Sequence, residues 1–418
     1  MESVLERKRV LIITASFPPD NTVASLRLAG FSKYLAEDFD VHVLTAGQSG
    51  KSFIEEEFMV FENGKRASVV RIKNNDWLYY FLSLDRKSWA FPHKLKVALR
   101  RGLGLMGLSP YRSWAKEARK YLHDYMKRDK PDVVISSYSP IEPVSITYDV
   151  LSSCASRETL WVLDMRDEYS QSQGASFLEK WLRRREERKF SQRADLLISV
   201  SMPLVYQYKN SMKDLRSFME VRNGFDHDLR FPAPLPRRKV QFGYFGSFYG
   251  QIKPYDIFEA ILALNLQDQI ELNIAVRNCN FKIPPELVET VKLLPYMEYE
   301  EAVKKMADMD CNILILPFND RPGVYSGKLF DYISSGRSIL AVVNTEDVAG
   351  KLVEKLGCGY LADYRSFEDI KRAVSKVVED WNAGCLRTAA ESEIEKMHRR
   401  KQVKKLSRWI NGCADELV

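Results

Sequence analysis

A group of polar and basic residues follows an apolar run in the second half of the chain, and its residue types suit phosphate and sugar binding. The stretch Ile313–Leu340 reads as a buried strand, a glycine-containing loop, an amphipathic helix and a further strand. Ser326 and Gly327 at the helix entrance leave backbone N–H groups free for an anion, and Lys328 adds a positive charge. Asp331, about one turn later, can accept hydrogen bonds from ribose hydroxyls. The pattern predicts a nucleotide site, although an N-cap serine, an exposed lysine and a dipole-favoured aspartate would look the same.

A second glycine-containing loop comes earlier in the same half of the chain. The segment FGSFYGQIKPYDIFEA, residues 245–260, reads as the end of a strand, a loop and a helix. Gly246 and Gly250 would let the backbone pass close to a ligand, and Lys253 could reach its phosphates. The segment has neither the G-x-G-x-x-G spacing of dinucleotide sites nor the GK[ST] ending of a P-loop. It therefore does not predict a simple dinucleotide or ATP site.

In the first half of the chain, polar residues lie at the entrance of an expected helix. Asn21, Thr22 and Ser25 belong to the loop SFPPDNTVASLR, whose prolines stiffen the turn. Arg27 falls within about the first turn of the helix, where it could face a cleft or pair with a surface carboxylate. This loop is a candidate for ligand contact.

Charged residues also follow a later strand, in the segment DMRDEY. Polar groups at the carboxyl end of a strand line the ligand side of an open α/β sheet. Asp167 could accept a hydrogen bond from a ligand hydroxyl, whereas Asp164 and Arg166 could form a buried pair that shapes the loop. Ser139, with Pro140, follows another strand end and is a further candidate.

Metal sites and catalytic nucleophiles have little support in the sequence. Two D-x-D patterns, at residues 226–228 and 308–310, resemble metal-binding aspartate pairs, but one borders a proline-rich segment and the other precedes a buried strand. The five histidines show no pairing, and the six cysteines are scattered without metal-ligand or disulfide-framework spacing. We therefore expect no metal, no serine–histidine–aspartate set and a reducing compartment.

The candidate residues would be positioned by short strands that alternate with longer helices, the pattern of parallel α/β sheets. In the first half the expected strands are Val10–Thr14, Val41–Thr45, Ser68–Ile72, Val133–Ser136, Leu160–Leu163 and Leu196–Val200. In the second half they are Gln241–Phe245, Glu271–Val276, Val291–Leu294, Asn312–Leu316 and Ser338–Val343. A polar, charged helix over about Ala389–Trp409 ends the chain.

The proline-rich segment FPAPLPRRK predicts a linker at residues 231–239, because proline fits neither a helix interior nor a central strand. We expect an N-terminal α/β domain over 1–230, a C-terminal α/β domain over 240–385 and a C-terminal helical segment over 386–418. The expected fold class is therefore α/β, with two Rossmann-like domains. Ligands bind at the carboxyl ends of strands in such sheets, so two facing sheets imply a cleft between the domains.

The composition limits the class of protein. The 418-residue chain is 28% charged and 45% hydrophobic, as expected for a soluble globular protein of two or three domains. The charged N-terminus and the lack of an apolar run near ~20 residues predict neither a signal peptide nor a membrane span. The excess positive charge lies between Asp85 and Lys130, with 13 basic and 4 acidic residues. Aromatic and apolar residues such as Trp89, Leu103 and Trp114 alternate with these basic residues. This segment therefore either lies on an anionic membrane or forms a solvated helical face packed on its domain.

Several segments in order resemble bacterial sugar-nucleotide glycosyltransferases of the two-domain GT-B fold, specifically the large retaining group numbered family four. In the first half these segments are FPPDNTVASLRLAGFSKYLAEDFDVHVLTAG, PDVVISSYSP, LWVLDMRDEYSQS and RADLLISVSMPLV. In the second half they are VRNGFD, FGYFGSFYGQIKP, MDCNILILPF and SGKLFDYISSGRSIL. The resemblance extends from about residue 9 to 375. It implies a GT-B fold in which a C-terminal helix returns toward the first domain.

The resemblance also implies roles for individual residues, with the donor bound mainly by the second domain and the acceptor mainly by the first. Lys253 and Lys328 would hold the donor phosphates, and Asp331 would bind the ribose. Tyr296 and Met297 fall where the family's backbone reads the base, or they simply pack in the core. The implied donor-binding residues are Gly246, Ser247, Lys253, Tyr296, Met297, Ser326, Gly327, Lys328 and Asp331. The implied acceptor-side residues are Asn21, Thr22, Arg27, Ser139 and Asp167, and the implied catalytic residues are Asp167, Lys253 and Lys328.

Two positions depart from the family's pattern. The family often carries two glutamates with seven residues between them, and Gly323 stands where the first would be. The family also tends to have an arginine in the loop before the lysine, where this chain has Ser247 and Phe248. Two lysines and helix N-termini would then neutralise the diphosphate without that arginine.

We therefore expect a metal-independent glycosyltransferase that moves a sugar from a nucleoside-diphosphate sugar to an acceptor hydroxyl, without a cofactor, in surface polysaccharide or glycoconjugate assembly. Its expected partners are the nucleotide sugar, a carbohydrate or lipid-linked acceptor and the inner membrane face, through residues 86–130, but no nucleic acid. The expected location is cytoplasmic or membrane-associated. The alternatives are a non-catalytic nucleotide- or sugar-binding protein, favoured by Gly323, and a sugar-nucleotide 2-epimerase, which the scarcity of histidines disfavours.

Overall fold

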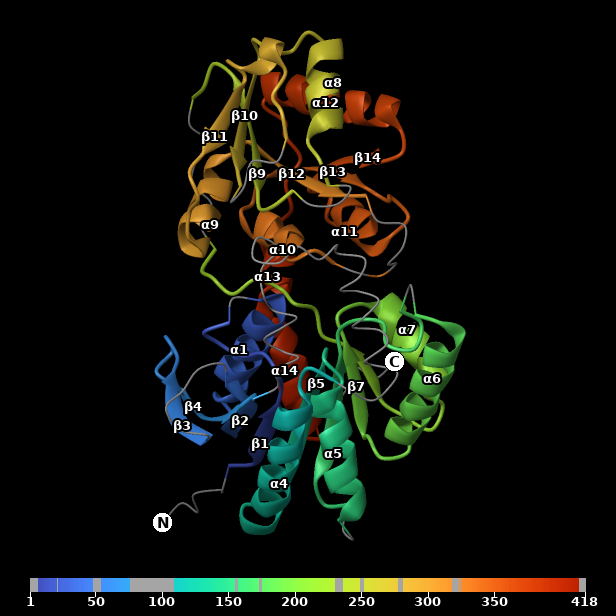
Figure 1. Cartoon of the computed structure of the whole chain (residues 1–418). Helices are drawn as coiled ribbons and strands as arrows, with labels where there is room; N and C mark the ends of the chain where they lie inside the picture. Colours follow the sequence, from blue (N-terminus) through green and yellow to red (C-terminus); the bar gives the residue numbers. More distant parts are fainter. Residues whose placement is uncertain are drawn as a thin grey trace. The chain divides into compact units, whose positions relative to one another are not determined.

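The computed structural model describes residues 7–20, 22–47, 54–75, 109–154, 157–172, 175–229, 236–248, 252–276, 281–317, 323 and 325–412. The chain divides into two compact units. Unit 1 comprises Met1–Val221 and Val403–Val418, and unit 2 comprises Arg222–Gln402. Each unit is built on one sheet with helices on both faces (Figure 1).

Unit 1 contains an eight-stranded sheet in the order β3-β4-β2-β1-β5-β6-β7-β8. Its strands are β1 (Arg9–Ile13), β2 (Asp40–Gly47), β3 (Ile54–Val60), β4 (Arg66–Lys73), β5 (Val133–Tyr138), β6 (Leu160–Met165), β7 (Leu196–Ser199) and β8 (Phe218–Glu220). Only the β3–β4 pair is antiparallel. The carboxyl ends of the parallel strands therefore lie at one edge, as expected for a Rossmann-like unit.

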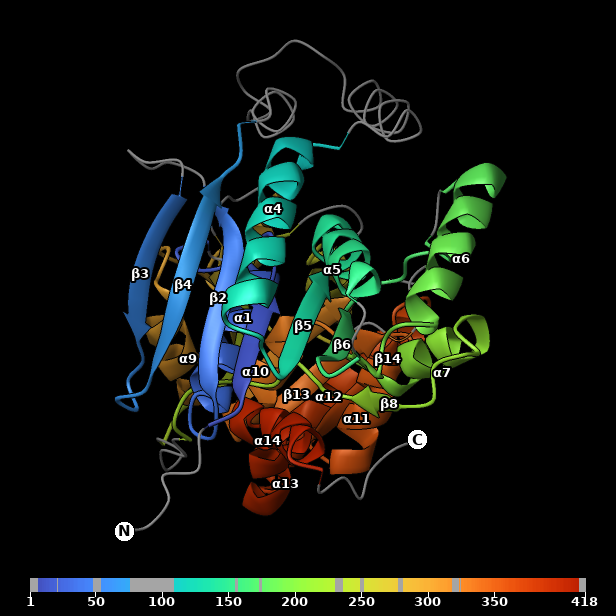
Figure 2. The same ribbon diagram turned by 90° about the horizontal axis from the view of Figure 1, so that it is seen from below.

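The alternation of apolar residues along β1 explains why both faces of this sheet are covered. Leu11 and Ile13 belong to a buried cluster with α4 and α5, whereas Val10 and Ile12 belong to a cluster with α1 and α14. Figure 2 shows these helix pairs on opposite faces. The helices of unit 1 are α1 (Val23–Leu35), α4 (Arg112–Arg128), α5 (Glu142–Ser153), α6 (Phe177–Ser191) and α7 (Met202–Ser211), together with most of α14 (Arg399–Ile410).

Unit 2 contains a six-stranded, fully parallel sheet in the order β11-β10-β9-β12-β13-β14. The strands are β9 (Val240–Phe245), β10 (Ile270–Ala275), β11 (Val291–Leu294), β12 (Cys311–Leu316), β13 (Ser338–Val343) and β14 (Gly359–Asp363). One face packs on α8 (Tyr255–Ala263) and α12 (Phe367–Asn382). The other packs on α9 (Tyr299–Asp308), α10 (Gly327–Ser334), α11 (Val348–Leu356) and α13 (Glu391–Lys396).

The C-terminal segment differs in detail from the single helix expected over Ala389–Trp409. It forms α13 and α14, separated at Met397 and His398. The break arises because the Arg399 backbone N–H donates to the Phe225 carbonyl at 2.8 Å, so α14 begins on a tertiary contact. Val403, Leu406 and Ile410 of α14 then join the core of unit 1, which confirms that the C-terminal helix returns to the first domain.

Three strands were not expected from the sequence: β3, β8 and β14. The β3 sequence IEEEFMV contains three consecutive glutamates, and β8 has only three residues, so neither carries a strong apolar pattern. The units divide at residues 221/222 and 402/403. Residues 231–235 of the expected linker lie outside the described residues, and the linker and the domain bounds stay a prediction.

The basic segment expected to contact a membrane is only partly described, because residues 86–108 lie outside the described residues. Its described part forms α4, whose Trp114, Ala118, Leu122 and Tyr125 are buried against the sheet. The apolar residues of α4 therefore belong to the core of unit 1. This agrees with the second alternative, a solvated helical face packed on its domain. Within the described ranges, every helix is too short or too polar to cross a bilayer.

Candidate functional site

The loop after β9 and the first turn of α10 meet at Gly246 and Lys328. Gly246 has a φ of +128°, a conformation that favours glycine. A Cβ atom there would lie 2.3 Å from Cε and 2.5 Å from Nζ of Lys328. The absence of a side chain at Gly246 therefore leaves the space that the lysine occupies, and the structure brings the two glycine-loop motifs together.

Lys328 is a half-buried ammonium group without a carboxylate partner in the described residues. Its Nζ donates a hydrogen bond to Tyr244 Oη at 2.9 Å and lies 4.5 Å from the centre of the Tyr244 ring. Burial lowers the pKa of Lys328 to about 8, because the charged form loses hydration. No ion pair involves this side chain within the described part of the chain. A partly desolvated cation without a carboxylate partner favours the binding of an anion.

Tyr244 holds the lysine in place and was not among the residues singled out from the sequence. Its ring stacks on Phe248 at 4.2 Å, with an interplanar angle of 7°, and its hydroxyl donates to the Ser247 carbonyl at 3.1 Å. The hydroxyl can therefore donate to the loop while it accepts from Lys328. Its position in an expected strand gave no sign of this role, because its contact with Lys328 joins residues 84 positions apart in the sequence.

The entrance of α10 provides uncapped backbone donors beside this lysine. Ser326 occupies the N-cap position with an extended backbone, but its side chain caps no backbone N–H. Tyr332 of the same helix accepts a hydrogen bond from the Phe245 N–H at 3.0 Å, which ties α10 to the end of β9. The first N–H groups of a helix and its dipole favour an anion. The helix entrance and Lys328 therefore both favour a negatively charged ligand.

Lys253 precedes α8, in the loop that begins at Gly246. Its side chain is half-buried, and within the described residues it takes part in no hydrogen bond or ion pair. Residues 249–251 of this loop, including Gly250, lie outside the described residues. Convergence of Lys253 and Lys328 on one diphosphate stays a prediction.

Asp331, the expected ribose ligand, already has a protein partner. Its Oδ1 accepts a hydrogen bond from Tyr299 Oη at 2.7 Å. Burial raises the pKa of Asp331 to about 6, and the bond from Tyr299 opposes that shift. A ribose at this position would therefore use the second carboxylate oxygen or replace the Tyr299 hydroxyl.

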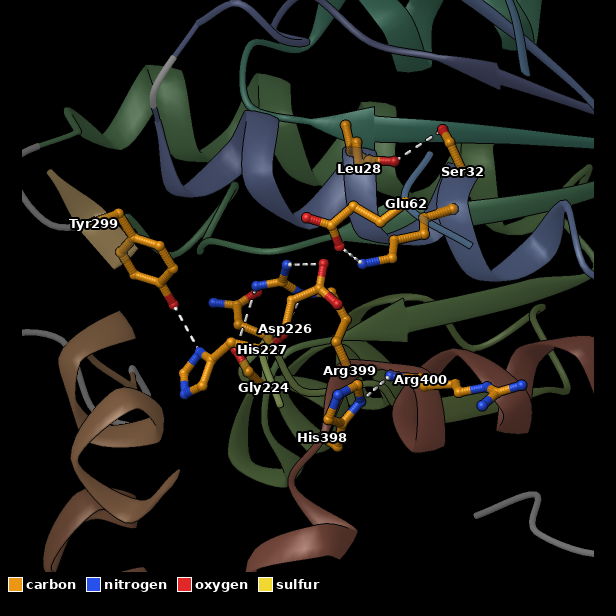
Figure 3. Close-up of polar contacts among 12 residues, drawn as sticks. Leu28, Ser32, Glu62, Gly224, Asp226, His227, Tyr299, His398, Arg399 and Arg400 are labelled. Atoms are coloured by element: carbon orange, nitrogen blue, oxygen red, sulfur yellow. Dashed lines mark hydrogen bonds and ion pairs between the residues drawn. The ribbon is translucent and has the colours of Figure 1, made fainter. Parts of the chain in front are cut away.

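The contact continues from Tyr299 to His227. Figure 3 shows the two side chains pointing toward one another, with Tyr299 Oη 3.5 Å from His227 Nδ1. His227 Nε2 lies 2.7 Å from Ser334 Oγ, which donates its own proton to the Asp331 carbonyl at 2.6 Å. Nε2 must therefore carry the proton, and Nδ1 carries none. Because Tyr299 donates its single proton to Asp331, its 3.5 Å approach to Nδ1 is a contact rather than a second full hydrogen bond. Burial lowers the pKa of His227 to about 4, so the ring is neutral at pH 7.

The glycine at the position of the family's first glutamate is held by a different carboxylate. Gly323 has a φ of +83°, and its N–H donates to Asp347 Oδ1 at 2.8 Å. Asp347 lies at the N-cap position of α11 but caps no backbone N–H of that helix. Asp347 was not among the residues singled out from the sequence, because nothing in its local pattern links it to Gly323. A carboxylate is thus present beside Gly323, although it comes from another loop.

Tyr296 and Met297 lie between β11 and α9. Tyr296 is exposed, and the half-buried Met297 packs against the buried cluster that contains Leu329 and Phe330 of α10. The alternative that these residues simply pack in the core therefore fits Met297. Contact of either residue with the base of the donor nucleotide stays a prediction.

The two D-x-D patterns are occupied by protein contacts. Asp226 pairs with Arg399 at 3.3 Å, as Figure 3 shows. Asp310 accepts from the Gln241 N–H at 2.8 Å and lies 3.8 Å from Arg237. Among the described residues, no group of three or more potential metal ligands comes together.

In unit 1, Arg27 is buried rather than facing a cleft. Its Nη2 pairs with Asp164 Oδ1 at 2.8 Å, and its Nη1 donates to the Val221 carbonyl at 2.7 Å. The expected Asp164–Arg166 pair is therefore wrong. A fully buried carboxylate needs a bidentate cation, and Arg27 supplies one from the neighbouring helix.

The other acceptor-side candidates lie at or near strand ends of unit 1. Arg166 donates to the carbonyls of Tyr138 and Ser139 at 2.7 and 3.1 Å, and Ser139 itself is exposed. Asp167 is half-buried, and its carbonyl accepts from Tyr208 at 2.6 Å. Thr22 caps α1 by accepting from the Ser25 N–H at 3.1 Å, whereas Asn21 lies outside the described residues.

Several solved structures to which this chain is similar are named as glycosyltransferases or solved with a nucleotide sugar. A glycosyltransferase from Rickettsia africae is 10% identical, with a TM-score of 0.66 over 97% of this chain and 98% of that one. The lipopolysaccharide outer core galactosyltransferase WaaB is 12% identical, with a TM-score of 0.60 over 97% and 99%. Anabaena HepE, solved with UDP-glucose, is 13% identical, with a TM-score of 0.59 over 97% and 100%. No family model and no curated protein matches the sequence.

These likenesses cover nearly the whole of each chain, and they show the fold. The chain has the two Rossmann-like domains of GT-B glycosyltransferases, as the ordered segments of the sequence indicated. At identities of 9–13%, likeness of fold does not carry over an activity, because one fold hosts many functions. The case for function therefore depends on the residues of the site.

Proposed function

We propose that this protein is a glycosyltransferase that moves a sugar from a nucleoside-diphosphate sugar to an acceptor hydroxyl. The observation that carries the proposal is Lys328, a half-buried and partly desolvated ammonium group without a carboxylate partner in the described residues. It lies against Gly246, where a side chain would be strained and would displace the end of the lysine, at a helix entrance whose N–H groups lack a side-chain cap. A diphosphate would supply the missing negative charge.

The same arrangement suits the chemistry of sugar transfer. As the bond between the sugar and the diphosphate breaks, negative charge grows on the leaving phosphate, and pre-placed cations and N–H groups stabilise it. Lys328 and the entrance of α10 would provide this stabilisation, with Lys253 as the second cation. Because Lys328 is already partly desolvated and is held by Tyr244, little reorganisation of this cation is needed during the reaction.

The finer features of the expected function belong to the same proposal. Asp167 would accept a hydrogen bond from the acceptor hydroxyl, and Asp331 would contact the ribose. We further propose a metal-independent, retaining reaction of the family-four type, acting on a carbohydrate or lipid-linked acceptor in surface polysaccharide or glycoconjugate assembly. HepE, with its bound UDP-glucose, supports UDP as the first donor nucleotide to test.

Calorimetric titration with UDP, GDP, ADP and dTDP tests the binding step. We expect at least one nucleotide to bind the wild-type protein, and Lys328→Met to weaken that binding by about 10- to 100-fold, because a desolvated charge pair is lost. Lys253→Met should weaken it as well, whereas Lys304→Met, on the exposed surface of α9, should not. If Lys328→Met and Lys253→Met both bound the nucleotide as tightly as the wild-type protein, the assignment of the donor site would be wrong.

A second measurement separates transfer from binding alone. The non-catalytic alternative keeps one observation in its favour, because Gly323 lacks a side chain and Asp347 lies on its N–H instead. Incubation with nucleotide sugars and a panel of acceptors should release nucleoside diphosphate only when an acceptor is present. Tight nucleotide binding without release in any combination would favour the non-catalytic protein.

A further inference from the structure

The outer face of α6 is unusual in unit 1, because large apolar side chains are exposed along it. Phe177, Leu178, Trp181 and Leu182 are exposed by 86%, 54%, 51% and 41%. Residues spaced by one, four and five positions lie on one side of a helix, so these four form one stripe. Figure 2 shows α6 at the edge of the unit.

The second half of the same face is basic. Arg184, Arg185, Arg188 and Lys189 are exposed, and none of them is in an ion pair within the described part of the chain. Every exposed residue of α6 is therefore either a large apolar or a basic residue.

The acidic residues of α6 all serve to hold the helix in place. Glu179 forms a capping box with Ser176, and Glu186 accepts a hydrogen bond from Tyr169. Glu187 is buried and accepts from the N–H and hydroxyl of Ser170 at 3.1 and 2.8 Å. The helix is thus fixed to unit 1 by its inner face, and its outer face carries no negative charge to offset the basic residues.

We propose that the outer face of α6, residues 177–189, docks this protein on an anionic lipid bilayer. Its aromatic and leucine side chains would enter the boundary between headgroups and acyl chains, while the arginines and Lys189 bind lipid phosphates. A two-fold contact with a second copy fits less well, because such a contact brings the same patch onto itself and would oppose like charges without any acidic residue. This surface belongs to unit 1, whereas the residues of the proposed donor site belong to unit 2.

Sedimentation of the full-length protein with vesicles tests the proposal. We expect binding to vesicles of equal parts phosphatidylcholine and phosphatidylglycerol, little binding to phosphatidylcholine alone, and weakening by salt. Phe177→Ser with Trp181→Ser, and separately Arg188→Gln with Lys189→Gln, should each reduce the partition coefficient by about tenfold.

Matched controls change equally exposed residues elsewhere in unit 1. Phe58→Ser with Val60→Ser removes side chains of β3 that are 67% and 70% exposed, and Lys404→Gln with Arg408→Gln removes two charges from α14. Both controls should bind as the wild type does. Brominated lipids should quench part of the tryptophan fluorescence of the wild-type protein. This quenching should be absent in Trp181→Phe, although this variant should still bind the vesicles.

The proposal fails if the wild-type protein does not sediment with anionic vesicles, or if the α6 variants bind as well as the controls. If the α6 variants instead change the molar mass measured by light scattering without lipid, the face is a contact between copies of the chain and the lipid proposal is wrong. Nucleotide binding by the α6 variants should equal that of the wild type, so this test is independent of the proposed transfer activity.

Discussion

At the scale of single residues, unit 2 holds two half-buried groups of opposite sign, Lys328 and Asp331, and the pKa of each is shifted so that its neutral form is favoured. Burial lowers the pKa of Lys328 to about 8 and raises that of Asp331 to about 6. The lysine is held by Tyr244, and the aspartate by Tyr299. Desolvated groups of this kind are concentrated at functional sites, where a ligand restores the interaction that folding removed.

The lysine should reduce stability at neutral pH. Its pKa of about 8 lies below the unfolded value of 10.5, so the penalty is complete below pH 8 and disappears as the pH rises toward 10.5. We expect Lys328→Met to raise the free energy of unfolding at pH 7 by about 1–3 kcal/mol, and by less at pH 9.5. Urea unfolding at both pH values measures this difference. A loss of stability at pH 7 would show that the ammonium group is satisfied by the protein itself.

The aspartate has the opposite pH dependence. Its folded pKa of about 6 exceeds the unfolded 3.8, so the penalty for its charged form is absent below pH 3.8 and complete above pH 6. Asp331→Asn keeps an oxygen for the Tyr299 hydroxyl, and we expect it to stabilise the protein by roughly 1–2 kcal/mol at pH 8 but not at pH 4. Thermal unfolding at the two pH values provides the test, and a gain that does not depend on pH would contradict it.

At the scale of elements, two strand–loop–helix units pack so that the loop after β9 faces the entrance of α10. The contact depends on Gly246, whose backbone leaves space for the lysine chain, and on Tyr332, which binds the end of β9. Helix α8 follows β9, and α10 follows β12. These two strands are parallel neighbours, so their carboxyl ends lie at the same edge of the sheet. Each of the two motifs, the glycine loop after β9 and the helix entrance at Ser326–Lys328, could be recognised from its local sequence. Their proximity in space follows from the order of the strands in the sheet.

A methyl group at Gly246 should disrupt this contact. Gly246→Ala would place Cβ 2.3 Å from Lys328 Cε, in addition to the strain of a φ of +128°. Gly384→Ala is the matched control, because Gly384 has a φ of +65° but no atom within 4 Å of the added Cβ. We expect both to lose about 1–2 kcal/mol of stability from backbone strain. Only Gly246→Ala should also weaken nucleotide binding, measured by calorimetry, and equal binding by the two variants would rule out the contact.

At the scale of the whole molecule, the chain completes unit 1 only with its C-terminal helix. Val403, Leu406 and Ile410 are buried among residues of β1 and α1, nearly the full chain length away in sequence. Unit 1 is thus discontinuous in sequence, whereas unit 2 is continuous, and the folded core of unit 1 requires residues from both ends of the chain. This core forms through contacts of very long range, which are slow to assemble.

Truncation of one buried leucine tests this dependence. Leu406→Ala should destabilise unit 1 by about 2–5 kcal/mol, because it opens a cavity in a closely packed core. Lys404→Ala, on the exposed side of the same helix, should change stability by less than about 0.5 kcal/mol. Hydrogen exchange of the amides of β1 reports the effect within unit 1. Unchanged protection of β1 in Leu406→Ala would show that α14 does not support this sheet.

Much of the fold could be predicted because buried parallel strands have a strong local pattern. The runs at Val10–Thr14 and Asn312–Leu316 predicted β1 and β12 closely, and Ser326–Lys328 marked the start of α10. The α4 helix shows the limit of local pattern, since its apolar residues could have faced lipid or core and only packing decided. The exposed apolar face of α6 was not recognised in the sequence for the same reason.

The amino-acid sequence by itself determined the α/β class, most of the strands, the glycine loops and the residue types that can bind a diphosphate, because these depend on neighbours along the chain. Only the tertiary structure decided which charges meet. Arg27 rather than Arg166 pairs with Asp164, Tyr299 binds Asp331, and Asp347 reaches Gly323. The physical reason is that a buried charge is satisfied by whichever partner the packing of distant elements brings within hydrogen-bond distance.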